Sequence, residues 1–162
     1  MCKKILESKG NYLSNRRIVT LIGSGQAKHG TVFIHKGPGS KCVDCEYFRV
    51  CVQNIESGRV YEIAGVRDKF LPCKQYETEM RVVEVTDAKI PSSLPTKQAM
   101  PGAIVVFQAP ECRNEGCESY EMCFPLGLKA GDRCEVLEVT ETFQCSLGAS
   151  RKKVVLRLSP AS

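Results

Sequence analysis

Cysteine is the residue type in this sequence whose number and spacing could do chemistry. Ten of the 162 residues are cysteines, and eight of them form two groups of four. In each group three cysteines lie close together, and a fourth follows 22 positions after the third. Sulfur ligands that converge on one point hold zinc ions or iron–sulfur clusters in proteins. The first quartet is Cys42, Cys45, Cys51 and Cys73, and the second quartet is Cys112, Cys117, Cys123 and Cys145.

The spacing inside each quartet indicates which metal centre to expect. The first three cysteines follow the pattern C-x2-C-x5-C in the first quartet and C-x4-C-x5-C in the second. Structural zinc sites usually combine two local cysteine pairs, whereas three near cysteines and a remote fourth are typical of a [4Fe–4S] cluster. We therefore expect two [4Fe–4S] clusters. The alternative is two Zn²⁺ ions held by the same eight cysteines.

The quartets belong to an internal repeat of the chain. The last three cysteines of the first quartet recur 72 positions later in the second. The apolar segment 30–35 recurs as 102–107 at the same offset, and segment 61–66 recurs as 134–139 at an offset of 73. Such self-similarity predicts two copies of one structural unit.

Two cysteines remain outside the quartets. Cys134 takes the place of Tyr61 in the second copy of the repeat, inside a predicted strand, so we expect a buried thiol there. Cys2 precedes the repeat and is interpreted as an incidental thiol.

β-branched and apolar runs between glycine- and proline-rich turns predict a mainly β fold. We expect two pseudo-repeated small β modules, each with a four-cysteine metal site, or one intertwined barrel or sandwich as the alternative. The predicted organisation is a basic N-terminal arm at 1–17, a first module at 18–86, a Pro/Ser-rich connection at 87–101 and a second module at 102–162.

Composition favours an intracellular protein. No apolar run approaches the roughly 20 residues of a membrane span, so no membrane contact is expected. Residues 1–17 lack the apolar core and the small-residue cleavage site of a secretory signal. We therefore expect a cytoplasmic location, where disulfides are disfavoured and clustered thiols more often bind metal.

The net charge of +5 has a local origin. The first 28 residues contain six lysines and arginines against Glu7 alone, and the remainder is balanced. Eight thiolates around two centres of charge +2 would leave a net charge of only +1. The basic arm and a basic run near the C-terminus nevertheless offer candidate nucleic-acid contacts, with a solvated surface as the alternative. These residues are Lys3, Lys4, Lys9, Arg16, Arg17, Arg151, Lys152 and Lys153.

Three functions follow from these features. The first is a non-catalytic module, stapled by metal, that binds RNA, a ribonucleoprotein or a protein partner. The second is electron transfer between two clusters. The third is catalysis, which the sequence supports least, because it contains no nucleophile with a matched base and uses all eight clustered cysteines as ligands.

Two resemblances extend this interpretation. The run 42–51 resembles the iron–sulfur staple of certain CRISPR-associated and recombination exonucleases and the auxiliary-cluster region of some radical-chemistry enzymes. The chain lacks the nuclease core and the C-x3-C-x2-C triplet of those enzymes, so this resemblance implies only the type of ligand. Over its whole length the chain resembles an uncharacterised archaeal cysteine-rich family, through Val19–Gly23, both cysteine triplets and Cys145 before a basic strand. That resemblance implies an archaeal origin and two quartets, and no activity.

Overall fold

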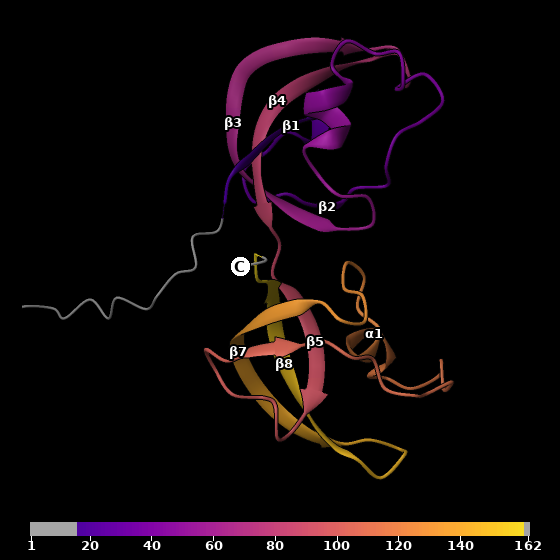
Figure 1. The fold of residues 1–162 in the computed structure, drawn as a ribbon, viewed down its shortest axis with the longest axis vertical. Helices are drawn as coiled ribbons and strands as arrows, with labels where there is room; N and C mark the ends of the chain where they lie inside the picture. The colour runs from indigo at the N-terminus through magenta and orange to yellow at the C-terminus, as the bar shows by residue number, and fades with distance from the viewer. Residues whose placement is uncertain (1–15, 161–162) are drawn as a thin grey trace, which may run out of the picture.

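The computed structural model describes residues 16–160, and it confirms a mainly β fold (Figure 1). The first half consists of strands β1 (Ile18–Gly23), β2 (Val32–Ile34), β3 (Val60–Cys73) and β4 (Thr78–Asp87), with a 3-10 turn η1 (Ser24–Gln26) and a π-helical turn η2 (Arg49–Gln53). The second half consists of strands β5 (Ile90–Pro95), β6 (Ile104–Val106), β7 (Arg133–Gln144) and β8 (Ser150–Leu158), with a short helix α1 (Tyr120–Cys123).

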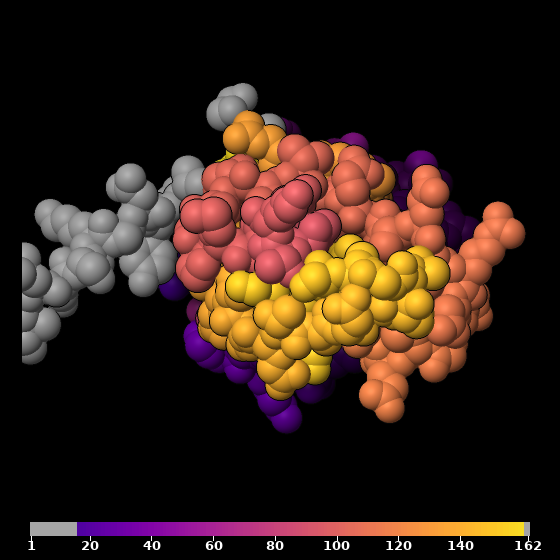
Figure 2. Space-filling view, turned by 90° about the horizontal axis from the view of Figure 1, so that it is seen from below, coloured from indigo at the N-terminus to yellow at the C-terminus, as the bar shows by residue number. Residues whose placement is uncertain are grey.

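Each half forms its own four-stranded antiparallel sheet. The strand order is β1-β4-β3-β2 in the first half and β5-β8-β7-β6 in the second. The halves follow each other along the longest axis of the molecule (Figure 1), and the second half fills the face seen from below (Figure 2). The two sheets are therefore separate, and the chain does not form one intertwined barrel.

The two sheets share their strand order and one irregularity of pairing. The pairing of β3 with β4 slips between Ile63 and Gly65, and the pairing of β7 with β8 slips between Val136 and Glu138, 73 positions later in each case. Such bulges bend a strand and increase its twist. The second slip differs between the sheets, because it runs from Val66 to Phe70 in β3 but from Val139 to Thr142 in β7.

One segment differs from the expected organisation. Residues 87–101 were expected to connect the modules, yet residues 90–95 form β5, whose central residues Ser92, Ser93 and Leu94 are fully buried. β5 pairs only with β8 and lies at the edge of its sheet, where prolines are tolerated because no second neighbour needs their N–H. The prolines that suggested a connection thus belong to the second copy of β1.

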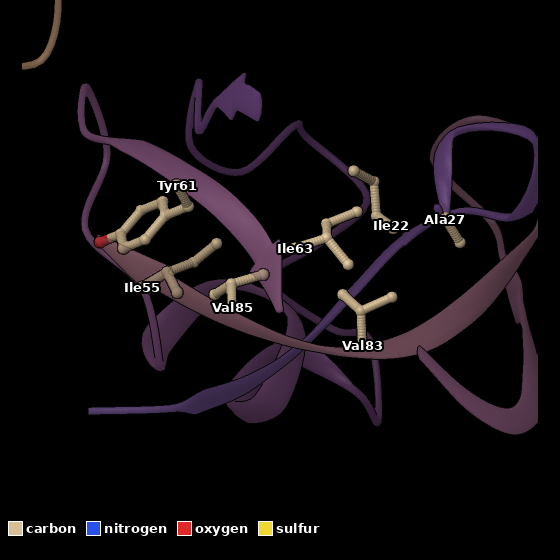
Figure 3. Packing of buried hydrophobic residues seen from close by; sticks show 7 residues of the cluster. All are labelled: Ile22, Ala27, Ile55, Tyr61, Ile63, Val83 and Val85. Carbon is tan, nitrogen blue, oxygen red and sulfur yellow. The ribbon is translucent and has the colours of Figure 1, made fainter. Parts of the chain in front are cut away.

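Alternating apolar side chains form one core in each half. In β3, Tyr61 and Ile63 point inward and meet Val83 and Val85 of β4, as Figure 3 shows. Burying side chains of this size contributes about 1.5–3 kcal/mol each. In the second half, Cys134 is fully buried in the equivalent core, as the repeat predicted. Cys2 lies outside the described residues.

The two halves meet through residues at equivalent positions of the repeat. Arg59 forms a two-pronged ion pair with Asp132, with Nη1–Oδ2 and Nη2–Oδ1 distances of 2.5 and 3.0 Å. Glu56 pairs with Lys129 at 3.3 Å. Both pairs join positions that are 73 residues apart. The halves are therefore arranged as if around a local two-fold axis.

Candidate metal centres

Three separate elements deliver the cysteines of the first quartet. Cys42 and Cys45 lie in the loop between β2 and η2, Cys51 lies in η2, and Cys73 is the last residue of β3. Consecutive turns shape this loop, because the backbone N–H of Cys45 donates to Cys42 O at 3.0 Å and that of Cys51 donates to Tyr47 O at 2.8 Å. The compact turns bring the three nearby cysteines to the end of the β3–β4 hairpin.

Side chains fix η2 and the loop onto the sheet. The fully buried hydroxyl of Thr20 in β1 donates to the carbonyl of Cys51 at 3.1 Å, and Asn54 Nδ2 donates to Val19 O at 2.8 Å. At the other end, the backbone N–H of Lys41 donates to Gln75 Oε1 in the β3–β4 turn at 2.8 Å. These bonds tie the loop cysteines to the hairpin that carries Cys73.

All four cysteines of the first quartet line one cavity of about 30 Å³. This volume holds one or two water-sized groups. Apolar side chains, among them Leu21 and Met80, form the wall on the side of the sheet. Lys41 and Lys74, which adjoin Cys42 and Cys73 in the sequence, also line the cavity. The cavity therefore combines soft ligands with a largely apolar wall.

The cysteines of the first quartet influence each other electrostatically. The pKa of Cys51 is raised to about 11, first by burial and then by the negative charges that Cys73, Cys42 and Cys45 would carry. Without a cation the Cys51 thiol keeps its proton, whereas a bound metal ion reverses this preference because it stabilises thiolates.

The second quartet occupies the equivalent positions of the second half. Cys112 and Cys117 lie in the loop before α1, Cys123 ends α1 and is buried, and Cys145 follows β7. Backbone N–H groups approach two of the sulfurs, from Asn114 to Cys112 Sγ at 3.4 Å and from Leu147 to Cys145 Sγ at 3.5 Å. Such donors are suited to a sulfur that carries negative charge.

The quartets are free thiols as they stand. Within residues 16–160, no group of three or more His, Cys, Asp or Glu side chains is arranged so that it could hold a metal ion. The sulfurs of a quartet would therefore have to rearrange to bind a metal centre. The metal centres and the role of the eight cysteines as ligands stay a prediction.

Comparison with known proteins places the chain in a family. A model of the uncharacterised protein family UPF0179 matches residues 18–156. The chain belongs to the UPF0179 family. It is 36% identical to UPF0179 proteins of Methanothermobacter thermautotrophicus, over 143 residues covering 86% of this chain and 97% of that protein, and of Methanocaldococcus jannaschii, over 147 residues covering 90% and 97%. The expected resemblance to an uncharacterised archaeal family is confirmed. No solved structure matches the chain.

The basic residues of this UPF0179 chain differ in how accessible they are. Arg17 pairs with Glu84 at 3.3 Å and Lys153 with Glu141 at 3.0 Å, both near the surface. Arg151 is only 5% exposed, so its place among the candidate nucleic-acid contacts was wrong. It turns toward the cysteine side of the sheet instead, where it contacts Ser93. Lys152 is half-buried, and Lys3, Lys4 and Lys9 lie outside the described residues.

The sequence did not indicate a polar cleft where the two halves meet. The cleft has a volume of about 760 Å³, and Arg16 and Asp87 contribute to its lining together with the Arg59–Asp132 pair. Burial raises the pKa of Asp87, against the opposing effect of nearby arginines. The residues that line the cleft come from both copies of the repeat, and the sequence showed only that some of them are charged.

None of the described helices is long and apolar enough to cross a membrane.

Proposed function

We propose that this UPF0179 protein is a metal-binding, non-catalytic module in which each cysteine quartet holds one metal centre. The observation that carries the proposal is the cavity of the first quartet, because four cysteines from three separate elements of the chain line it. A small β unit gains stability from such a staple, since binding free energy of the metal becomes folding free energy.

Two metal centres fit the donor set, and a specific observation favours each. Three near cysteines and a remote fourth favour a [4Fe–4S] cluster, and a cluster of eight core atoms would require the loop of Cys42 and Cys45 to move outward from the small cavity. The cavity of about 30 Å³ favours a single Zn²⁺ ion, which needs only a tetrahedral closure of the four sulfurs.

Metal analysis of anaerobically purified protein tests the proposal. We expect either about eight irons with broad absorbance in the visible range or about two zinc ions per chain. Cys51→Ser should remove one centre, whereas Cys134→Ser should leave the metal content unchanged because Cys134 lies in the core away from the quartets. Metal-free, folded wild-type protein would refute the proposal.

The partner of the module is proposed to be RNA. The support is the concentration of positive charge in the first 28 residues. Arg16 lines the cleft between the halves, and Arg17 lies at the surface, where it pairs with Glu84 of β4. Phosphate contacts make binding weaker as salt rises. We expect salt-dependent RNA binding that is lost when residues 1–17 are removed, and binding indifferent to both changes would contradict an RNA partner.

Electron transfer between two clusters is the second candidate function, and the duplication of the quartets favours it. A redox titration of the iron-loaded protein separates the two roles. A pair of clusters that cycles reversibly supports electron transfer, whereas clusters that are lost on reduction or oxidation support a structural role.

A further inference from the structure

The two quartets rest on different surfaces of their sheets. The strand registers make the comparison exact at the level of single residues: Gly23 of β1 lies opposite Met80, and Pro95 of β5, 72 positions later, lies opposite Arg151. By the same registers Leu21 corresponds to Ser93, which lies two residues before Pro95. Leu21 and Met80 of the first half are therefore replaced by Ser93 and Arg151 in the second.

In the first half this surface is apolar. Leu21, Met80 and Val82 form a buried cluster, and Cys51 and Cys73 pack against it. Leu21 and Met80 also line the cavity that the four cysteines share. The first quartet thus lies against an apolar surface of its sheet.

In the second half the equivalent surface is polar and positively charged. The Arg151 guanidinium donates through Nε to Ser93 Oγ at 3.0 Å and through Nη2 to Ser93 O at 3.1 Å. Ser93 Oγ lies 3.1 Å from Cys123 Sγ, and both Ser93 and Cys123 are buried. A continuous chain of hydrogen-bonding groups therefore leads from Arg151 to the third cysteine of the second quartet.

The charge of Arg151 needs a counter-charge. A buried cation is costly unless an anion or a full set of acceptors compensates it. Among the described residues no carboxylate lies within ion-pair distance of Arg151, in contrast to Arg59, which is also buried and pairs with Asp132. The group that Ser93 connects to Arg151 is a cysteine sulfur. Four thiolates around a divalent ion carry a net charge of −2, and such a centre would supply the missing counter-charge.

We propose that Arg151 and Ser93 are positioning and charge-compensating residues for the metal centre of the second quartet, and that the first quartet works without them. This inference rests on the proposed function. Ser93 would donate to the Cys123 sulfur and hold its orientation, while Arg151 fixes Ser93 and compensates the negative charge of the thiolate set. Partners of this kind commonly change metal affinity by about 10–100-fold.

The test measures zinc affinity of the second quartet alone, in the full chain with the first quartet disabled by Cys51→Ser and Cys73→Ser. Competition between protein and a chelator of known affinity reports the dissociation constant for Zn²⁺. We expect Arg151→Met, which introduces the side chain of the equivalent first-half position, to weaken zinc binding by about 10–100-fold. Arg151→Lys keeps the positive charge and should retain most of the affinity. Ser93→Ala breaks the connection at its middle and should weaken binding in the same direction.

Arg157→Met is the matched control, because Arg157 lies near the opposite end of the same strand and pairs with Glu135 at 3.8 Å. It should leave zinc affinity unchanged. The inference is overturned if Arg151→Met binds zinc as well as this control, or if Arg151→Lys is as weak as Arg151→Met. A second quartet that binds no zinc in the otherwise wild-type background would refute the proposed function at this site as well. Circular dichroism of each metal-free variant shows that the sheet is intact.

Discussion

The ion pair between the halves leads to a quantitative prediction for Asp132→Asn. The Arg59 side chain is 10% exposed and that of Asp132 is 13% exposed, so the pair is largely shielded from water. The substitution keeps the shape of the side chain and removes the charge opposite the guanidinium. Arg59 retains a hydrogen bond from Nη1 to Gly127 O at 3.0 Å and an ion-pair contact from Nε to Glu56 at 3.3 Å.

The magnitude follows from what remains around Arg59. Removing one member of a buried ion pair costs about 3–5 kcal/mol, because the other charge stays buried. Since Glu56 and Gly127 still contact the guanidinium, we expect the lower end of this range, about 3 kcal/mol. For a chain of this length that corresponds to a decrease in Tm of about 6–12 °C. Replacing both charges, as in Arg59→Met with Asp132→Leu, should cost less than Asp132→Asn alone.

Thermal and urea unfolding of the two variants check this prediction. Arg17→Met serves as the control, because it breaks the more exposed Arg17–Glu84 pair and should change stability by less than about 1 kcal/mol. The reasoning is refuted if Asp132→Asn unfolds within about 0.5 kcal/mol of wild type, a change typical of surface substitutions away from such pairs.

The same pair predicts how the difference depends on pH. Burial alone would raise the pKa of Asp132, but hydrogen bonds from Arg59 and from the Lys129 N–H outweigh it and leave the pKa below its ordinary value of 3.8. A carboxyl group whose pKa is lower in the folded state stabilises the protein fully above its unfolded pKa and loses this contribution as pH falls through the folded value. The gap between wild type and Asp132→Asn should therefore be constant near neutral pH and shrink below about pH 4.

Three further predictions concern single positions. Gly127→Ala should destabilise the protein more than Gly131→Ala. Both glycines have a positive φ, which costs alanine about 1–2 kcal/mol, but only at Gly127 would a Cβ lie 2.7 Å from Val60 Cγ2. Equal decreases in Tm would contradict this prediction. The pKa of Cys134 is raised to about 12, first by burial, so iodoacetamide at pH 8 should leave it unmodified in native protein by peptide mass spectrometry; rapid labelling would show that the core is open there. Burial raises the pKa of Asp87, so its charge costs stability at neutral pH, and Asp87→Asn should raise Tm at pH 7 with a gain that disappears in acid; a lower Tm at pH 7 would contradict it.

The sequence predicted the repeat and most of the strands because both are local in the chain. Apolar alternation at Tyr61 and Ile63 and the offset of 73 to Val136 report on faces of strands, and these faces are set by burial. The strand β5 was missed because Pro91 and Pro95 signal a break, and only the edge position in the sheet makes them acceptable.

The grouping of the first-quartet cysteines could be seen in the sequence, whereas the residues that surround them could not. The spacing of Cys42, Cys45, Cys51 and Cys73 was enough to group them, and the structure places all four at one cavity. The burial of Arg151 could not be seen, because a basic run reads as surface until the register shows which side chain faces inward. The cleft between the halves needs residues from both copies, whose contacts depend on tertiary structure alone.

The pairing of Arg59 with Asp132 constrains how this architecture arose and what its halves can assemble with. Two identical chains that met around the same two-fold axis would place arginine against arginine, or aspartate against aspartate, since residues that lie at such an axis meet their own copy. Opposite charges at one equivalent pair, and again at Glu56 and Lys129, require the two copies to have diverged from each other. The interface between the halves is therefore asymmetric in charge. The charges of the first half complement those of the second and would repel those of another first half, which favours pairing within one chain over pairing between chains.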